Sequence, residues 1–431
     1  MTSVAFFNLA ERFAIAFFHI AFSCRKRIII FCQWRLQYCF QRFRKGEMVK
    51  FVHTSDWQLG MKRHFLQPEA QGQFTGDRVN TIRTIGEVAR RAGAEFIVVA
   101  GDVFETNRLP QRDIVQSLDA MREVGLPVYL LPGNHDVLGS SSIYDSPAYV
   151  EAEPDNVTVL RTPGRHIVRE GVEILAAPWT SKTPDFDPVN GPLKKLLEDL
   201  PADGTVRIVL GHGMLQELEP NQLSIDAIDP RPLDKAISAG VIHYVALGDR
   251  HIRWPADDSG AIHYSGAHEV TDYREAQNGS SATDPGSVLI VDVSPKELNV
   301  TSERVGKWRF MRADFDLTNE QDVQALDRKL TDIENANTTI IKLVLTGALS
   351  TSAKLELDHV LERHEARFTA LEYWDRHMNL QVLPDEDDFS ELPQDGYLRR
   401  AVDELTENRE DDAVAAEALM LLHKIMNEDA L

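Results

Sequence analysis

Residues able to bind metal ions or contact phosphate follow several short apolar runs in the chain. The runs are FVHTSD, FIVVAGD, VYLLPGNHD, RIVLGHG and YVALGDRH. In chain order, the polar residues at their ends are Asp56, Asp102, Asn134, His135, Asp136, His212, Asp249 and His251. Carboxylates, amide oxygens and imidazoles are the groups that hold divalent cations in hydrolytic sites. The pattern therefore indicates a hydrolytic metal centre, with two ions.

Each run has the length and the β-branched composition of a β-strand and is closed by Gly or a polar turn. Between the runs, apolar residues recur at spacings of three or four over 77–92 and 112–124, which predicts helices there. Alternating strands and helices favour a layered α/β domain. In open α/β sheets, ligands bind beyond the carboxyl ends of the strands. We therefore expect these run ends to meet in one crevice.

The order of these motifs resembles the calcineurin-like metallophosphoesterase superfamily. The shared motifs are D-x-(H), GD, GNHD, GH and GD/H-x-H, while HTSDWQLG, RVGKWRF and the C-terminal helical pattern are similar to the SbcD-type DNA repair exonuclease branch. The resemblance runs from about Met48 to the C-terminus, and its motifs are more specific for the superfamily than for the branch. It implies an α/β fold: a four-layer α/β/β/α sandwich of two mostly mixed sheets, with a small α+β capping domain and C-terminal helices.

The resemblance also implies a role for each residue of the site. Asp102 would bridge two cations about 3.5–4 Å apart, the spacing used for in-line phosphoryl displacement. His135 would act as general acid or contact the leaving oxygen, and Asp136 would orient His135 or pair locally. The implied ligands are Asp56, Gln58, Asp102 and His251 for the first metal, and Asp102, Asn134, His212 and Asp249 for the second.

Two of these positions depart from the family's pattern, because Gln58 and Asp249 stand where the family normally has His. Each metal position therefore loses one imidazole, and the ligand set becomes rich in oxygen. Oxygen ligands favour harder ions, so we expect Mn²⁺, or alternatively Mg²⁺, in preference to Zn²⁺. The departures leave open a weaker first position and an altered or lost activity.

The chain divides by composition into four segments. Residues 1–47 are rich in Phe, Ile and Arg, and we interpret them as an extension before a true start at Met48. Charged residues interrupt both of its apolar stretches, which argues against a membrane span. Residues 48–285 form the expected catalytic domain, 286–383 a capping domain that contacts DNA, and 384–431 an acidic linker with helices. The apolar stripe of those helices either packs on its own domain or docks a partner.

Composition limits the setting in which the chain works. Its 431 residues carry a formal net charge of -21, which repels polyanions at long range. Attraction to nucleic acid must then come from metal ions, from a partner chain or from local basic residues such as Arg108, Arg250, Arg253 and Arg274. All three cysteines lie before residue 48, so the rest can form neither disulfides nor thiolate metal sites, which fits a reducing cytoplasm.

The resemblance, together with the oxygen-rich ligand set, implies a manganese-dependent DNA exonuclease subunit of a repair complex. The resemblance further implies a homodimer and a partner similar to the coiled-coil ATPase SbcC, which would supply DNA affinity. Two alternatives remain open: a phosphodiesterase or phosphatase for small molecules, and a DNA-end-binding scaffold whose metal site is weakened by Gln58 and Asp249. Among the other histidines, we expect His53 to be structural, because it lies inside the first strand, and His268 to occupy a loop without joining the site.

Overall fold

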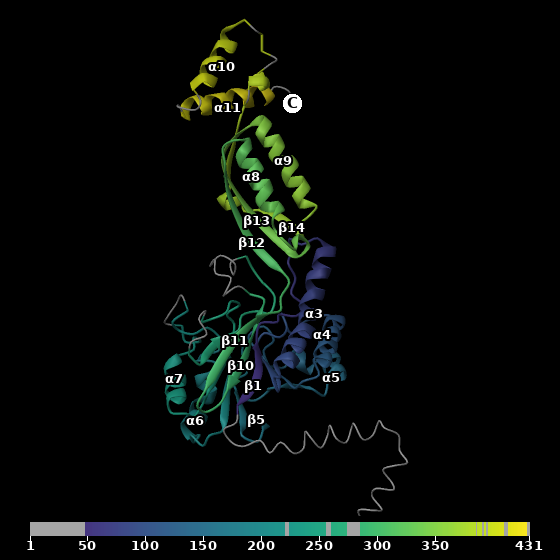
Figure 1. Ribbon diagram of the computed structural model, residues 1–431, viewed down its shortest axis with the longest axis vertical. Helices are drawn as coiled ribbons and strands as arrows, with labels where there is room; N and C mark the ends of the chain where they lie inside the picture. Colours follow the sequence, from purple (N-terminus) through teal and green to yellow (C-terminus); the bar gives the residue numbers. More distant parts are fainter. Residues whose placement is uncertain are drawn as a thin grey trace, which may run out of the picture. The chain divides into compact units, whose positions relative to one another are not determined.

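The computed structural model describes most of the chain from Met48 onward (Figure 1). The described residues are 48–219, 224–255, 260–273, 285–384, 386–389, 392–393, 395–408 and 413–428. The extension 1–47 with its cysteines, and Arg274, lie outside these ranges, and so do the predictions made for them. Within the same ranges, no helix combines the length and the apolar character that crossing a membrane requires.

A six-stranded mixed sheet carries the first three metal-site motifs. Its order is β11-β10-β1-β2-β3-β4, with β1 to β4 parallel and β10 antiparallel to β1. The strands are β1 (Val49–Thr54), β2 (Phe96–Ala100), β3 (Val128–Leu131), β4 (Val157–Val159), β10 (Ser287–Val293) and β11 (Leu298–Arg304). The helices α3 (Pro68–Ala92), α4 (Gln111–Val124) and α5 (Pro147–Ala152), and the 3₁₀ turn η1 (Ile143–Asp145), follow β1, β2 and β3.

A second mixed sheet carries the remaining two motifs. Its order is β5-β6-β7-β8-β9, with β6 to β9 parallel and β5 antiparallel. The strands are β5 (Gly164–Arg169), β6 (Val172–Ala176), β7 (Val206–His212), β8 (Tyr244–Gly248) and β9 (Ile262–Tyr264). The helices of this half are α6 (Asn190–Asp199) and α7 (Pro230–Ser238).

The alternation of side chains along the strands builds three buried layers between four layers of backbone. Val98 of β2 and Ile208 of β7 meet in the core between the two sheets. Their neighbours Ile97 and Val209 point the opposite way, into cores shared with α3 and α4 on one side and with α6 and α7 on the other. Strands buried on both faces explain the nearly continuous apolar runs of the sequence. The predicted α/β/β/α sandwich is confirmed.

The helix predicted at 77–92 begins nine residues earlier, at Pro68. The added segment contains Gly72 and Gly76, which lower helix propensity and hide the periodic pattern. Two features compensate: a proline in the first turn, whose fixed φ suits a helix start, and the burial of Phe74 against Trp308 and Phe310. The proline and the packing of Phe74 together therefore set this helix start.

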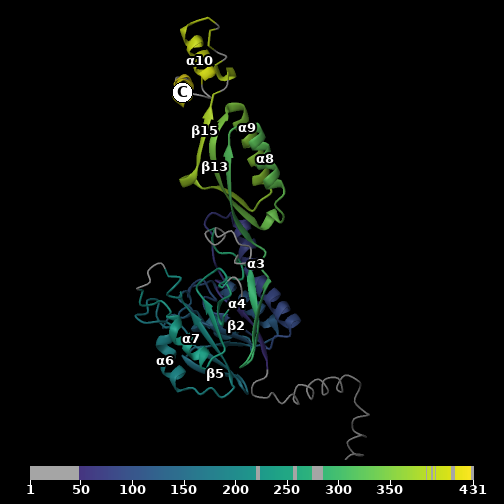
Figure 2. The same cartoon turned by 60° about the vertical axis from the view of Figure 1, so that its left-hand side comes forward.

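Strands β10 and β11 follow the domain boundary predicted at 285/286. β10 pairs with β1 and β11 pairs with β10, so the six-stranded sheet continues to Arg304. The second domain follows with β12 (Arg309–Leu317), α8 (Glu320–Thr331), β13 (Thr339–Ser350), α9 (Thr351–Glu365), β14 (Ala370–Tyr373) and β15 (Asn379–Leu383), joined by the 3₁₀ turns η3 (Ala336–Thr338) and η4 (Asp375–His377). Its sheet is parallel, and α8 and α9 pack on one face (Figures 1 and 2).

The last described segment is a pair of helices after the 3₁₀ turn η5 (Glu386–Phe389). Helices α10 (Tyr397–Asn408) and α11 (Ala413–Glu428) share a small core formed by Phe389, Val402 and Leu419. Part of the predicted apolar stripe therefore packs within this segment. Other large apolar residues of the two helices remain exposed: Tyr397, Leu398, Val414, Leu421 and Ile425.

His53 of β1 is buried between the sheets, where Nδ1 lies 3.0 Å from Tyr244 Oη and Nε2 3.2 Å from the Leu247 carbonyl. Burial, and then the neighbouring His263, lower the pKa of His53 to about 3. Below pH 6.5 the unfolded chain therefore binds a proton that the folded chain does not, and stability falls as the pH drops toward 3.

We expect His53→Gln to remove this acid sensitivity. Between pH 7 and pH 5, the free energy of unfolding of the variant should fall by about 2 kcal/mol less than that of the wild type, as urea titrations would measure. Parallel stability curves for the two proteins would show that His53 does not titrate in this way.

Candidate metal centre

The loops after β1, β2 and β8 hold four candidate ligands in an unusual backbone conformation. The φ angles are 51° at Asp56, 41° at Gln58, 52° at Asp102 and 94° at Asp249. Residues other than glycine rarely adopt positive φ, and such residues cluster at functional sites. Backbone hydrogen bonds hold the loops: Asp56 N donates to Gly101 O at 3.1 Å, and Gln58 N to Asp102 O at 2.9 Å. The strand ends are thereby tied together around the side chains.

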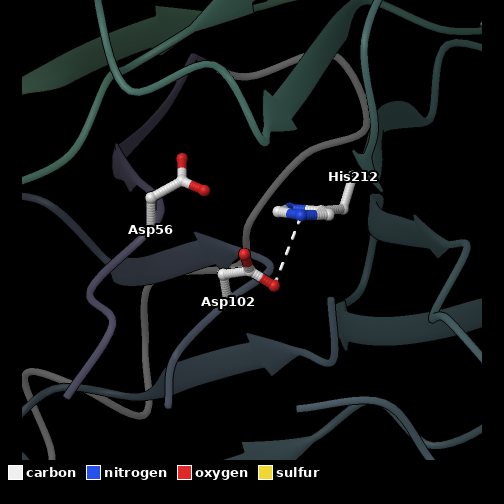
Figure 3. A group of neighbouring side chains, drawn as sticks. All are labelled: Asp56, Asp102 and His212. Carbon is white, nitrogen blue, oxygen red and sulfur yellow. Dashed lines mark ion pairs between the residues drawn. The ribbon is translucent and has the colours of Figure 1, made fainter. Parts of the chain in front are cut away.

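Asp56, Asp102 and His212 form the centre of the site, as Figure 3 shows. One potential ligand atom from each of them lies within 4.8 Å of the other two, and all three side chains are buried. His212 Nε2 is 3.4 Å from Asp102 Oδ1 (Figure 3). Asp102 also contacts the β3 loop, since the backbone N–H of His135 donates to Asp102 Oδ1 at 3.0 Å. Asp102 thus lies between ligands from both sheets.

Asn134 and His212 present their metal-binding atoms to each other. His212 Nδ1 lies 2.9 Å from the Ala100 carbonyl, which can only accept, so Nδ1 carries a proton and Nε2 faces the site. Nε2 is 2.9 Å from Asn134 Oδ1. That amide oxygen also faces the Asp102 carboxylate, so two acceptors meet without a donor. Either a turned amide, which would donate an N–H to the carboxylate, or a cation between the two oxygens satisfies this contact. The donor set therefore fits a divalent cation at this position.

Asp249 and His251 lie at the edge of this cluster. Asp249 Oδ1 is 3.8 Å from His212 Nε2, and its backbone N–H donates to Asp56 Oδ1 at 3.0 Å. His251 Nε2 is 4.0 Å from Asp56 Oδ1, and its Nδ1 is 2.6 Å from Thr271 Oγ1. The predicted ligands of the two sheets are thus brought together.

Gln58 is also inside the site and is 2% exposed. Its Nε2 lies 3.0 Å from His251 Nε2, while its Oε1 is buried with no hydrogen-bond partner in the described structure. A buried acceptor without a partner is costly in a folded protein. An amide oxygen in this state is available as a ligand, which is the role that the sequence predicts for it.

The two predicted catalytic residues have different surroundings. His135 is partly exposed: Nδ1 lies 2.9 Å from the Glu105 carbonyl, and Nε2 is 3.9 Å from Asp102 Oδ2. Asp136 is fully buried and accepts hydrogen bonds from the backbone N–H groups of residues 103, 104 and 133 and from the Tyr144 hydroxyl. Asp136 thereby fixes the β3 loop that carries His135, and its carboxylate pairs locally.

Burial and neighbouring charges shift the pKa values of the residues in the cluster. Burial raises the pKa of Asp102, but the attraction of His212 and His135 is stronger and lowers it to about 2. Burial lowers the pKa of His212, yet the surrounding Asp102, Asp249 and Asp56 raise it well above its ordinary value. Burial raises the pKa of Asp249 to about 6. A proton on His212 thus balances negative charge that a cation would otherwise neutralise.

Gly133 precedes Asn134 at a point where only glycine fits. A Cβ at this position would lie 2.2 Å from Asp102 Oδ1 and 3.0 Å from His212 Nε2. Gly101 is similarly constrained, since its Cβ would lie 2.0 Å from His212 Nδ1. The glycines of the GD and GNHD motifs therefore make room for the ligands, which accounts for their place in the sequence.

We expect Gly133→Ala to displace the Asp102 carboxylate and to lower hydrolysis about 100-fold, with weaker Mn²⁺ binding. Gly139→Ala is the matched control, because a Cβ there meets no atom within 4 Å. Steady-state hydrolysis and calorimetric Mn²⁺ titration of both variants would measure this. Equal behaviour of the two variants would contradict the steric argument.

Several groups that hydrogen-bond to the candidate ligands belong to no motif recognised in the sequence. Ser55 Oγ donates to Asp56 Oδ2 at 2.6 Å, and the Ala100 carbonyl and Thr271 orient the two histidines. Of the residues considered earlier, His268 Nε2 contacts the Arg78 carbonyl at 2.9 Å and is buried. Arg250 lies between Asp249 and His251 in the chain, and its Nε is buried without a hydrogen-bond partner in the described ranges.

Comparison with known proteins adds independent information. A family described as Calcineurin-like phosphoesterase matches residues 49–277, which include every candidate ligand. The DNA double-strand break repair protein Mre11 of Archaeoglobus fulgidus is 26% identical over 251 residues, 53% of this chain and 52% of that protein. The chain thus spans about half the length of that relative.

Two further relatives are similar over different shares of the chain. The uncharacterized metallophosphoesterase YhaO of Bacillus subtilis is 24% identical over 338 residues, covering 72% of this chain and 76% of that protein. The SbcD component of the nuclease SbcCD of Staphylococcus epidermidis is 23% identical over 245 residues, 51% of this chain and 61% of that protein. The similarity to YhaO covers more of the chain than residues 49–277 do.

Proposed function

The chain belongs to the calcineurin-like phosphoesterase family, whose match covers more than half of it, and we propose that it is a metal-dependent DNA exonuclease acting in repair. The observation that carries the proposal is the convergence on Asp102 of ligand side chains from both sheets. Two relatives, one named as a DNA repair protein and one as part of a nuclease, support DNA as the substrate. The reaction is hydrolysis of a phosphodiester to a free hydroxyl and a phosphomonoester.

The ligands form two groups around the shared Asp102. Asp56, Gln58 and His251 would hold one ion, and Asn134, His212 and Asp249 would hold the other. We assign Mn²⁺ to both positions, with Mg²⁺ as the alternative, because two carboxylates and one amide serve each ion. When bound, the ions supply an activated water and neutralise charge on the phosphate.

The chain's own residues position the phosphate and manage its protons. His135 lies within 3.9 Å of Asp102, with its Nε2 on the partly exposed side of the cluster, and we assign it to the leaving oxygen. Asp136 acts as a positioning residue through the β3 loop. The Asp136 carboxylate accepts hydrogen bonds from Tyr144 and from the backbone after β2, and these bonds limit the movement of the loop that carries His135.

The second domain is assigned to DNA contact, because cations and aromatic rings alternate near its β13 strand. Lys342 Nζ lies 4.8 Å from the Tyr273 ring centroid and 5.5 Å from that of Trp374, and Arg312 Cζ lies 4.8 Å from Trp374. Such interleaving suits a nucleic acid, which offers phosphates and stacked bases.

Lys342→Gln should weaken duplex DNA binding and lower the slope of log K against log salt by about 1, while hydrolysis of a small diester stays unchanged. Fluorescence anisotropy at several salt concentrations measures the first effect. An unchanged slope would remove Lys342 from the DNA-contacting surface.

A partner and a second copy complete the proposal. The exposed apolar residues of α10 and α11 support docking of a coiled-coil ATPase similar to SbcC, and we propose a homodimer as the assembled form. Deleting residues 395–431 should abolish co-purification with the ATPase, and light scattering measures the dimer.

The absence of cysteine after residue 47 supports a cytoplasmic location.

The test of function compares substrates for the full chain with Mn²⁺. We expect release of nucleotides from linear duplex DNA, reduced to background by EDTA. Cyclic nucleotides and small phosphate diesters are the comparison substrates. Faster hydrolysis of these than of DNA would favour the small-molecule phosphodiesterase, and DNA binding without any hydrolysis would favour the scaffold.

A further inference from the structure

Helix α3 carries a buried arginine, Arg78, that contacts two of the loops around the metal centre. Its Nε and Nη2 donate to the Trp57 carbonyl at 3.2 and 3.0 Å. Its Nη1 donates to the Val270 carbonyl at 3.0 Å and to the Glu269 carbonyl at 3.4 Å. Trp57 belongs to the loop after β1, and residues 269–270 belong to the loop after β9. One guanidinium group therefore joins two loops that are distant in the chain.

Both loops support candidate ligands of the same ion. Trp57 stands in the chain between two of these ligands, Asp56 and Gln58. The loop after β9 supports the third ligand, His251, whose Nδ1 lies 2.6 Å from Thr271 Oγ1. The hydrogen bonds of the arginine thus reach the backbone next to all three side chains proposed for this ion.

A guanidinium group suits this place because its donors form a planar fork of fixed geometry, whereas a lysine has one compact ammonium group. The Arg78 Cζ lies 5.4 Å from the Phe74 ring centroid. The same helix holds the loop after β9 at a second point, since Thr81 Oγ1 donates to the buried Glu269 carboxylate at 2.7 Å. That carboxylate also accepts the backbone N–H of Trp308 at 3.0 Å. Contacts on several sides therefore fix the orientation of the fork.

We propose that Arg78 is a positioning residue for one of the two metal ions, because it holds both loops that present the three ligands of that ion. This inference rests on the dinuclear centre of the proposed function. The ligands Asn134 and His212 of the other ion come from the ends of β3 and β7. Groups that orient metal ligands typically contribute about 10- to 100-fold to metal affinity. Loss of the fork should therefore weaken one ion by this factor and change the other by less than about threefold.

The test is a Mn²⁺ titration of the metal-free full chain by calorimetry and electron paramagnetic resonance. Two neighbouring Mn²⁺ ions couple magnetically and give a spectrum that differs from that of one bound ion. Arg78→Lys keeps the charge and removes the fork, and Arg78→Gln is an uncharged second variant if the lysine prevents folding. In either variant, one binding step should weaken about 10- to 100-fold, and the coupled spectrum should need correspondingly more Mn²⁺.

Arg207→Lys is the matched control, because Arg207 is also buried, at the opposite end of β7 from His212. It donates to the Pro201 carbonyl at 2.8 Å and to the Glu173 carboxylate at 3.0 Å. This variant should lower the unfolding temperature and leave both binding steps within about threefold of the wild type. Equal losses of Mn²⁺ affinity in the Arg78 and Arg207 variants would reduce the role of Arg78 to general stability and overturn the inference.

Combination with ligand variants identifies which ion depends on Arg78. In Asn134→Ala, the remaining ion is the one held by Gln58 and His251, and adding Arg78→Lys should weaken it about 10- to 100-fold. In His251→Ala, adding Arg78→Lys should change the remaining ion by less than about threefold. Equal effects in the two backgrounds, or the reverse pattern, would overturn the inference.

Binding is measured without substrate, so this experiment and the test of the proposed function can fail separately. A selective loss of one ion in the Arg78 variants, with no DNA hydrolysis by the wild type, would support the role of Arg78 and reject the proposed nuclease. DNA hydrolysis by the wild type, with equal losses at both metal positions in the variants, would reject the role of Arg78 alone.

Discussion

Asp102→Asn is expected to reduce hydrolysis at least about 1000-fold and to weaken the binding of both ions. Asp102 is the carboxylate that we propose the two metal positions share, and His212 Nε2 lies 3.4 Å from its Oδ1. The attraction of His212 and His135 outweighs burial and holds the pKa of Asp102 at about 2, so the side chain is anionic at neutral pH. An asparagine offers one neutral oxygen in place of a delocalised charge, and it cannot bridge two cations.

The variant should remain folded, which makes the loss interpretable. The amide oxygen of asparagine can still accept the N–H of His135, which donates to Asp102 Oδ1 at 3.0 Å. Mn²⁺ calorimetry would report the lost binding, and circular dichroism with thermal unfolding in EDTA would report the fold. Retention of two tightly bound ions in Asp102→Asn would exclude Asp102 as the bridging ligand.

The layered fold follows from sequence because it depends on local patterns, and the same patterns predict the candidate site residues. Each strand that leads into a ligand motif is a largely buried apolar run, and the ligands stand at its carboxyl end, where parallel strands bring side chains together. The same reasoning fails for β10 and β11. These strands lie far along the chain from β1, and no local pattern shows with which sheet they pair.

The finer geometry of the site could not be predicted, because it depends on contacts between distant segments. The positive φ of Asp56 and Asp102 is fixed by hydrogen bonds between the loops after β1 and β2. The contact of Gln58 with His251 joins residues 193 positions apart. Sequence therefore predicts Gln58 as an unusual ligand, while only the structure shows that its amide nitrogen lies 3.0 Å from Nε2 of His251.

The local role of Asp136 illustrates the same limit. Its place in GNHD is equally compatible with orienting His135 directly or with pairing locally. The structure gives it four hydrogen-bond donors, from three backbone N–H groups and the Tyr144 hydroxyl. Tyr144 follows the motif at a distance with no recognisable spacing, so this support could not be read from the sequence.

His135→Ala is expected to lower kcat for DNA about 100- to 10,000-fold while leaving Mn²⁺ affinity within a factor of two or so. His135 Nδ1 lies 2.9 Å from the Glu105 carbonyl, which requires a proton on Nδ1 and directs Nε2 toward the cluster. That nitrogen is 3.9 Å from Asp102 Oδ2, beyond hydrogen-bond distance, so in the metal-free protein it is not committed to Asp102. A proton donor placed there can protonate the departing sugar oxygen.

The leaving group separates this role from a purely structural one. In a diester with a p-nitrophenolate leaving group, this group departs readily without protonation. The loss of kcat in His135→Ala should therefore be at least tenfold smaller with this diester than with DNA. Equal defects with both substrates would indicate that His135 contacts the phosphate and does not donate a proton. Loss of Mn²⁺ binding in the variant would instead make it a metal-site residue. Because Asp136 fixes the loop through the backbone N–H of Gly133, which His135→Ala leaves intact, the variant removes the imidazole without moving Asn134.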